Sequence, residues 1–218
     1  MLKKFGEEKL NFQLRQHFAT GVAAFMESWR RENTASADVL LDCFFDELSR
    51  RPIDESDNFR VRLFPHRSTA KKAKGGALLL SLYEPDLRFQ KAILLRARAS
   101  MNLAVTEEGN FFDTETIKAE AAEMLKLSQS SCFCSFAPQG IHVISASSVL
   151  GDTANDAYLL KNFYYLNIAD FMGNLFFKCF VGDTRPGFIE GLREGKHCRN
   201  LLEMRITATP TVSQRPLF

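Results

Sequence analysis

Two leucine-rich runs lie close together in the middle of the chain, and they constrain the fold more than any other feature. The first is GGALLLSLYE (75–84) and the second is KAILLRARAS (91–100), with only a short stretch around Pro85-Asp86 between them. A connection this short cannot carry a parallel crossover, so the two runs must be antiparallel. We therefore predict a β-hairpin of two core strands.

Periodic residue patterns predict the elements on either side of this hairpin. Apolar residues at three- and four-residue spacing predict helices, and alternation of apolar and polar residues predicts strands. The predicted helices are 7–33, 37–50, 113–129 and 156–180, and the other predicted strands are 59–65, 131–138, 141–149 and 199–210. This order predicts an α/β or α+β fold, with a mixed central sheet flanked by helices and an N-terminal helical pair.

The length of the chain predicts one domain. We expect it to span residues 1–209, with a helical N-terminal part at about 6–50 and a flexible tail at 210–218. The 218 residues are enough for one large core. The 20 phenylalanines predict that aromatic packing dominates that core.

The cysteines and the first residues bear on the cellular compartment. The start, MLKKFGEEKLNFQLRQHF, carries charges throughout and lacks the apolar region of a secretory signal. No apolar run is long enough to cross a bilayer. We expect a cytoplasmic protein without membrane contact, in which the cysteines are free. They are Cys43, Cys132, Cys134, Cys179 and Cys198.

Basic residues are clustered although the formal net charge is only +2. The stretch FRVRLFPHRSTAKKAK, which ends at Lys74, contains Lys, Arg and His but no acid, and 88–98 is also basic without an acid. One interpretation is a solvated loop and a strand end. The other is a phosphate-binding patch, because clustered Lys and Arg release counterions when they meet a polyanion.

A succession of short patterns runs from about Arg60 to Val149. GGALLL (75–80) and KAILLRAR (91–98) precede the helical AEMLKLS and the strand-turn-strand SCFCSFAPQGIHVISASSV. This succession resembles the restriction-endonuclease-like superfamily of PD-(D/E)XK nucleases, in particular bacterial members found near phage-defence genes. In those proteins a strand reading GAD-x-apolar leads to one reading K-x-apolar-apolar-Q-A-K. The resemblance implies a restriction-endonuclease-like fold.

The catalytic pattern of that family is altered in this chain. The family holds a divalent cation, usually Mg²⁺, with an Asp on the first strand and an acid or Gln on the second, and a Lys two residues later helps to activate water. These positions fall at Leu78, Arg96 and Arg98. Leucine and guanidinium groups offer a cation no lone pair, and Arg stays protonated and cannot act as a base. We therefore expect neither a metal cofactor nor catalytic residues there.

An alternative interpretation keeps the nuclease activity. Asp86 would be the acid of a migrated site, with Glu84 and the helical Glu7 or Glu8 as helpers, since related nucleases use an acid on their first helix. Mg²⁺ would be a cofactor only in this case. Pro-Asp is also a common turn sequence, which explains Asp86 without catalysis. Asp86 and Glu8 are therefore the weaker catalytic candidates.

Arg96 and Arg98 are two residues apart and so share one face of the predicted strand. Arg binds phosphate oxygens bidentately without a metal, so the pair is a candidate phosphate site. The competing interpretation is an ion pair with Glu120 or Glu123 on the helix packed over the sheet. The candidate contacts to DNA or to an acidic partner are Arg60, Arg62, Arg67, Lys71, Lys72, Lys74, Arg96 and Arg98.

Other kinds of site have less support. Cys132 and Cys134 share a strand face and would need His142 and either His197 or Cys198 to bind zinc. Zinc sites commonly use CxxC turns instead, and buried cysteine is common in protein cores. The sequence has no P-loop, GxGxxG or nucleophile elbow, so nucleotide hydrolysis, dinucleotide binding and acyl transfer are unsupported.

The resemblance implies a catalytically degenerate nuclease-like accessory subunit in a bacterial defence or DNA-processing complex. Its partners would be double-stranded DNA and other subunits, such as an ATPase or an active nuclease. The aromatic segment 156–180 would be core, or would pack in part on another subunit. The alternatives are an active Mg²⁺-dependent DNA endonuclease with its site at Asp86, and a structural interaction subunit that does not contact DNA.

Overall fold

A seven-stranded mixed sheet forms the centre of the protein, with the strand order β1-β7-β2-β3-β4-β5-β6. The computed structural model describes residues 7–32, 37–53, 59–68, 75–84, 87–99, 114–137, 139–151, 166–178 and 180–208. The strands are β1 (Phe59–Arg67), β2 (Gly76–Glu84), β3 (Leu87–Ala99), β4 (Ser131–Ala137), β5 (Gly140–Ser145), β6 (Leu166–Asn167) and β7 (Asn200–Ala208). The α/β class and the N-terminal helical pair are as predicted.

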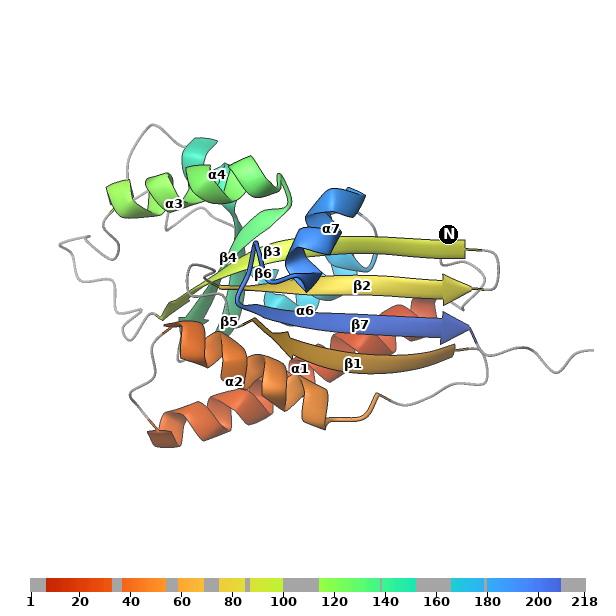
Figure 1. Ribbon diagram of the computed structural model, residues 1–218. Helices are drawn as coiled ribbons and strands as arrows, with labels where there is room; N and C mark the ends of the chain where they lie inside the picture. Colours follow the sequence, from red (N-terminus) through yellow and green to blue (C-terminus); the bar gives the residue numbers. More distant parts are fainter. Residues whose placement is uncertain are drawn as a thin grey trace, which may run out of the picture.

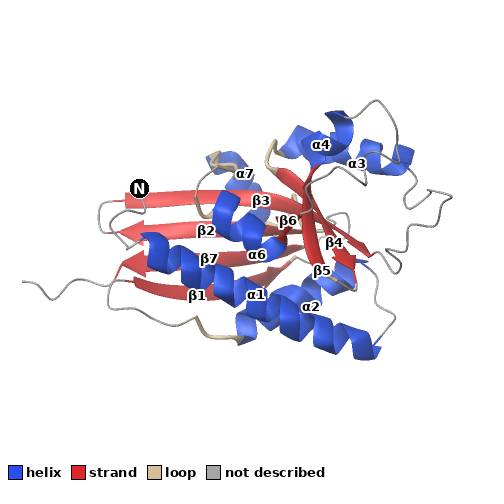
Figure 2. Cartoon of the chain, turned by 180° about the vertical axis from the view of Figure 1, so that it is seen from behind, coloured by secondary structure: helices blue, strands red, loops and turns tan. Residues whose placement is uncertain are grey.

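Helices cover the two faces of this sheet unequally. Helices α1 (Glu7–Glu32) and α2 (Ala37–Arg50) lie across one face together with α6 (Ile168–Phe171) and the π-helix η2 (Met172–Phe176) (Figure 2). We call this the α1/α2 face. On the other face lie α3 (Thr114–Leu127), α4 (Ala146–Gly151) and α7 (Pro186–Arg193) (Figure 1). We call this the α7 face.

The predicted hairpin is confirmed. Strands β2 and β3 pair antiparallel over their whole shared length, and Leu78 lies directly opposite Ile93. On its other side β2 pairs in parallel with β7, so both neighbours of this apolar strand are hydrogen-bonded to it. Side chains alternate between the faces, so Leu78 and Leu80 enter the core under α1 and α2, while Leu79 enters the smaller core under α7.

Aromatic side chains fill the core of the α1/α2 face, as the phenylalanine content predicts. Phe44 of α2 is fully buried. Its ring centroid lies 5.8 Å from that of Phe25, 6.4 Å from that of Phe18 and 6.4 Å from that of Phe136 on β4. The steep angles between these rings are those that aromatic quadrupoles favour. The helical pair is thus fixed to the sheet by interlocking phenylalanines.

Most predicted elements agree with the structure to within a few residues. Helices α1, α2 and α3, strands β1 and β4 and the final strand β7 all lie where periodicity predicts them. The predicted helix 156–180 is only partly tested, because 156–165 lie outside the described residues. Its later part forms the short strand β6, α6 and η2 instead of one continuous helix. The predicted tail 210–218 also lies outside the described residues.

Two predictions are wrong in detail. The predicted strand 141–149 ends at Ser145, and the chain continues as α4. Ala146 at the start of α4 is fully buried in the core shared with α3, so tertiary packing overrides the strand-like composition. Helix α7 was not predicted, and it contains two glycines, which are unfavourable in helices. Pro186 at its first turn and the buried Phe188, Ile189 and Leu192 were the available signals.

None of the described helices has both the length and the apolar character required to cross a membrane.

Candidate nucleic-acid interface

The three positions of the nuclease pattern do not meet in the structure. Directly opposed residues of an antiparallel pair share a face, so Leu78 points to the α1/α2 face with Ile93. Arg96 and Arg98 are one and three residues beyond Leu95, which also belongs to that core, so they alternate onto the α7 face. The residues at the three positions of the nuclease pattern therefore do not form one site.

Arg98 is engaged within the protein. Its Nη2 forms an ion pair with the Glu120 carboxylate of α3, and its guanidinium carbon lies 5.9 Å from the ring centre of Phe133. Only 26% of its side chain is exposed. The expectation that a helix glutamate pairs with this arginine is confirmed for Arg98, which anchors α3 to the sheet.

Arg96 is half-buried on the same face. Its Nε and Nη1 atoms are buried and have no hydrogen-bond partner among the described residues. The guanidinium lies beside the backbone of Gly75, where an added Cβ would come within 3.4 Å of Nη1. Arg96 therefore lies in a closed setting and not on an open surface.

The remaining predicted residues separate into several groups. Arg67 pairs with Asp46 of α2 at 2.5 Å, because its position on β1 turns it toward the α1/α2 side. Glu8 is exposed on α1, which covers that same side. Lys71, Lys72, Lys74 and Asp86 lie outside the described residues. Of the predicted contacts, Arg60 and Arg62 are the two that meet on an exposed part of the sheet.

Arg60 and Arg62 belong to a larger polar surface on the α7 face, which we call the open face. The pairing registers align side chains across four strands in two rows. One row runs Arg60, Thr207, Tyr83, Arg88, and the next runs Arg62, Arg205, Ser81, Gln90. In Figure 1 these rows lie toward the arrowhead ends of β2 and β7, beyond α7.

Exposure distinguishes the open face from the rest of the sheet. Arg60, Arg62, Arg88 and Thr207 are exposed, and Tyr83 is half-buried. Arg205 keeps 41% of its side chain accessible. The sheet face next to it, under α3 and α7, is instead built from buried residues such as Leu79 and Leu94. The open face is therefore solvated except at Ser81, which is buried.

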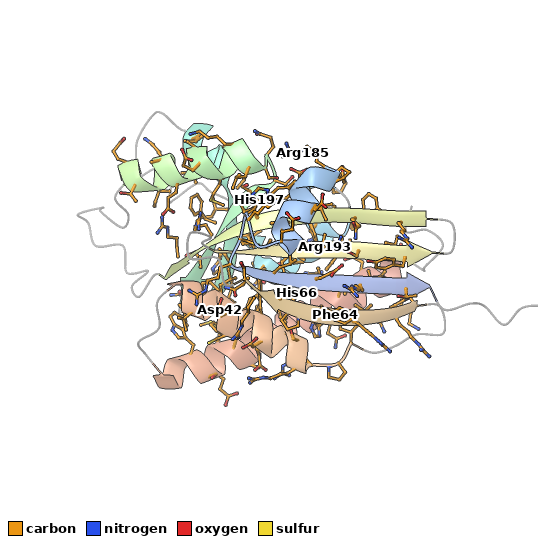
Figure 3. The ribbon with its side chains drawn as sticks, in the orientation of Figure 1. Asp42, Phe64, His66, Arg185, Arg193 and His197 are labelled. Atoms are coloured by element: carbon orange, nitrogen blue, oxygen red, sulfur yellow. The ribbon has the colours of Figure 1, made fainter. Side chains whose placement is uncertain are left out.

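A buried glutamate lies beneath these arginines. Glu203 on β7 is 1% exposed and accepts hydrogen bonds from three side chains: Arg205 Nη2 at 2.8 Å, Arg193 Nη2 at 2.9 Å and Ser81 Oγ at 2.7 Å. His66 Nε2 lies 3.6 Å from Glu203 Oε2, the oxygen that accepts from Arg205. Figure 3 shows His66, Phe64 and Arg193 on this face. We call Glu203, Arg205, Arg193, Ser81 and His66 the Glu203 cluster.

The cluster keeps Glu203 ionised. Burial alone would raise the pKa of Glu203, but hydrogen bonds from Arg205, Ser81 and Arg193 outweigh burial and hold the pKa at about 2, below its ordinary 4.5. In return, the hydrogen bond to Glu203 raises the pKa of Arg205, as does the nearby Tyr83. One buried charge thus holds two guanidinium groups at the border of the open face.

Arg205 is also held from its other side. Its guanidinium carbon lies 4.4 Å from the ring centre of Phe64 on β1, a cation–π contact. The guanidinium is thus held both by the hydrogen bond to Glu203 and by the contact with the Phe64 ring. Few rotamers satisfy both contacts, so Arg205 is preorganised.

A cavity of about 220 Å³ adjoins the cluster between the end of β1 and α7. Its lining includes the basic side chains of His66, Arg193 and Arg199 and the acid Glu194. Because His66 and Arg193 also belong to the Glu203 cluster, the cavity extends the basic surface toward the start of β7.

The cysteines do not form the weaker zinc site. Cys132 and Cys134 are buried in the α1/α2 core, and burial raises the pKa of Cys132 to about 12. His142 pairs with Ser135 and therefore points to the other face. Cys198 is buried in the core under α7. In the described parts of the chain, no group of three or more His, Cys, Asp or Glu residues is placed to hold a metal ion.

The sequence reasoning missed Tyr83, Arg88, Arg193 and Arg205 as candidate contacts, although Arg88 begins the basic stretch 88–98. Arg205 had a usable signal, because the alternation in LLEMRIT (201–207) places Glu203, Arg205 and Thr207 on one face of a strand and Met204 with Ile206 on the other. Tyr83 closes a leucine-rich run and gave no comparable signal. Arg193 lies on the helix that was not predicted.

No protein-family model, no curated protein and no solved structure matches this chain.

Proposed function

We propose that the protein binds nucleic acid through its open face, as a nuclease-like accessory subunit. The observation that carries the proposal is the charge of that face. Arg60, Arg62, Arg88 and Arg205 lie in two adjacent rows of one sheet surface. Among the residues that the structure describes on these strands, the carboxylate of Glu203 is buried and already bonded to Arg193 and Arg205. A polyanion fits this surface by charge.

Phosphate is the chemical group that best matches the open face. Guanidinium groups bind phosphate oxygens bidentately, and several on one surface gain further from the release of counterions. Arg205 is held in place by Glu203 and Phe64 before any ligand arrives. Less conformational entropy is then lost on binding than with a free side chain.

The accessory role in a bacterial defence or DNA-processing complex rests on the sequence resemblance. In support, the hairpin β2–β3, the helix α3 and the strand-turn-strand β4–β5 follow one another in the order that the resemblance implies. A partner subunit, such as an ATPase or an active nuclease, and a cytoplasmic location belong to the same proposal. The proposed binding surface differs from the predicted one, since Arg67 and Arg98 are engaged in ion pairs.

Binding is tested with fluorescently labelled DNA and anisotropy over a series of salt concentrations. The test variant combines Arg60→Gln, Arg62→Gln and Arg88→Gln. We expect it to bind at least tenfold more weakly at about 100 mM salt, and the slope of log K against log salt to fall by about 2 to 3, as for three lost phosphate contacts.

A matched control separates location from net charge. Lys9, Arg50 and Lys178 are exposed cations on the α1/α2 side, and changing all three to Gln removes the same charge. This variant should keep the wild-type affinity and salt slope. Equal weakening by both triple variants, or no binding by the wild type at low salt, would contradict the proposal. Plasmid cleavage in Mg²⁺ that Asp86→Ala abolishes would favour the nuclease alternative instead.

A further inference from the structure

Planar groups alternate with the arginines of the open face. Tyr83 occupies the row between Thr207 and Arg88, and it is half-buried, not enclosed in the core. Arg205, in the adjacent row, presents a second planar group supported by the Phe64 ring at 4.4 Å. Aromatic rings and guanidinium planes are the surfaces on which unpaired bases stack.

The strand geometry sets the width of this surface. Four neighbouring strands about 4.8 Å apart place the first and last side chains of a row, Arg60 and Arg88, about 14 Å from each other. The major groove of B-DNA is about 12 Å wide and admits a helix or a two-stranded ribbon. A four-stranded sheet face is too broad to enter it.

A duplex could then touch the open face only with its phosphates. Its bases are stacked on one another and cannot reach Tyr83 or the Arg205 plane. A single strand lacks this restriction, since its bases can turn toward the sheet while its phosphates meet the arginines. Only a single strand can therefore contact both the arginines and the planar groups of the open face.

From this arrangement we infer that the open face binds single-stranded nucleic acid in preference to duplex, with Tyr83 as a stacking platform and the Arg205–Phe64 pair as a second one. This inference rests on the proposed nucleic-acid binding. It assigns the phosphate contacts to the exposed arginines and the preference for unpaired bases to the planar groups.

The test compares three labelled ligands of equal phosphate number. They are a single-stranded DNA, a duplex of half its length, whose two strands together carry the same number of phosphates, and a full-length strand in which abasic sites replace the central bases. We expect the wild-type protein to bind the intact strand at least fivefold more tightly than either of the others. The abasic strand is decisive because it keeps every phosphate and loses only the bases.

Variants at Tyr83 locate the stacking. Tyr83→Leu should weaken binding of the intact strand about fivefold or more, within the range for one stacked base, and should leave the abasic strand unaffected. Tyr83→Phe keeps the ring and should bind as the wild type does. If Tyr83→Leu fails to fold, as judged by circular dichroism, the wild-type comparison of intact and abasic strands still decides the question.

The two proposals fail in different ways. If intact, abasic and duplex DNA bind equally, while the Arg60, Arg62 and Arg88 variant binds none of them well, the single-strand inference is overturned and nucleic-acid binding stands. The single-strand inference is likewise overturned, and nucleic-acid binding stands, if the wild type binds duplex tightly and Tyr83→Leu leaves the affinity for the intact strand unchanged. If no ligand binds the wild type at low salt, both proposals are overturned.

Discussion

Arg193 of α7 donates a hydrogen bond of 2.9 Å to the buried carboxylate of Glu203 on β7. Glu203 also receives Arg205 from its own strand at 2.8 Å and Ser81 from β2 at 2.7 Å. One acid therefore joins a helix and two strands at the border of the open face. Its ionisation state affects stability as well as the orientation of the arginines.

Replacing Glu203 by Gln should lower the free energy of unfolding by about 2 to 3 kcal/mol at pH 7. The pKa of Glu203 is depressed to about 2 from its ordinary 4.5, so its charge stabilises the fold fully above the unfolded pKa. This contribution is lost as the pH falls from about 4.5 toward 2. The difference between wild type and variant in urea denaturation should narrow by about 1 kcal/mol between pH 7 and pH 4.

Glu190→Gln provides the control for this experiment, since Glu190 is an exposed glutamate on the same helix as Arg193. It should change stability by less than about 0.5 kcal/mol at either pH. A Glu203→Gln difference that stays constant between pH 7 and pH 4 would show that the charge of Glu203 does not stabilise the fold.

The ion pair between Arg98 and Glu120 should be a stability contact and not a binding contact. A double-mutant cycle with Arg98→Ala and Glu120→Ala should give a coupling energy of about 0.5 to 1 kcal/mol, because the pair is about three-quarters buried. Arg98→Ala should leave DNA affinity within about twofold of the wild type. A tenfold loss of affinity without loss of stability would restore Arg98 as a phosphate contact.

Gly75 and Gly187 should respond to alanine with opposite signs. Gly75 has φ +70°, and an added Cβ would lie 2.4 Å from the carbonyl oxygen of Leu95, so Gly75→Ala should destabilise by about 1 to 3 kcal/mol. Gly187 lies in α7 with nothing within 4 Å of an added Cβ, so Gly187→Ala should stabilise by about 0.5 to 1 kcal/mol. Thermal melts followed by circular dichroism measure both changes, and equal effects would contradict this description of the backbone.

Phe44 should be among the most sensitive core positions. It is fully buried among other phenylalanine rings, so Phe44→Ala should cost about 3 to 5 kcal/mol in urea denaturation. Phe12→Ala is the control, because Phe12 is 65% exposed on α1. It should cost less than about 0.5 kcal/mol. Comparable losses for the two variants would mean that the rings around Phe44 do not pack as described.

Local patterns were sufficient for the elements whose packing follows their own periodicity. The hairpin β2–β3 and helices α1 and α2 fall in this group, since each shows a regular apolar spacing and a clear boundary. Helix α7 contains two glycines, and its stability comes from burying Phe188 and Leu192 under the sheet. Such a helix depends on contacts that no local window contains.

The candidate site was predictable only in part, because neighbours in sequence were grouped as neighbours in space. Arg62 and Arg67 are close along β1 yet point to opposite sides of the sheet. Arg205 joins Arg62 across a strand pair whose members are far apart in the chain. The open face forms because β7 lies between β1 and β2. The sequence of β7 alone does not predict which strands it pairs with.

The position of β7 also has a consequence for folding during synthesis on the ribosome. It follows the other six strands of the described sheet along the chain, yet it hydrogen-bonds to β1 on one side and to β2 on the other. Until Ala208 has been translated, the facing backbone edges of β1 and β2 have nothing between them. A nascent chain therefore exposes these two strand edges from the synthesis of β2 until that of β7, and in that interval self-association or a chaperone competes with folding.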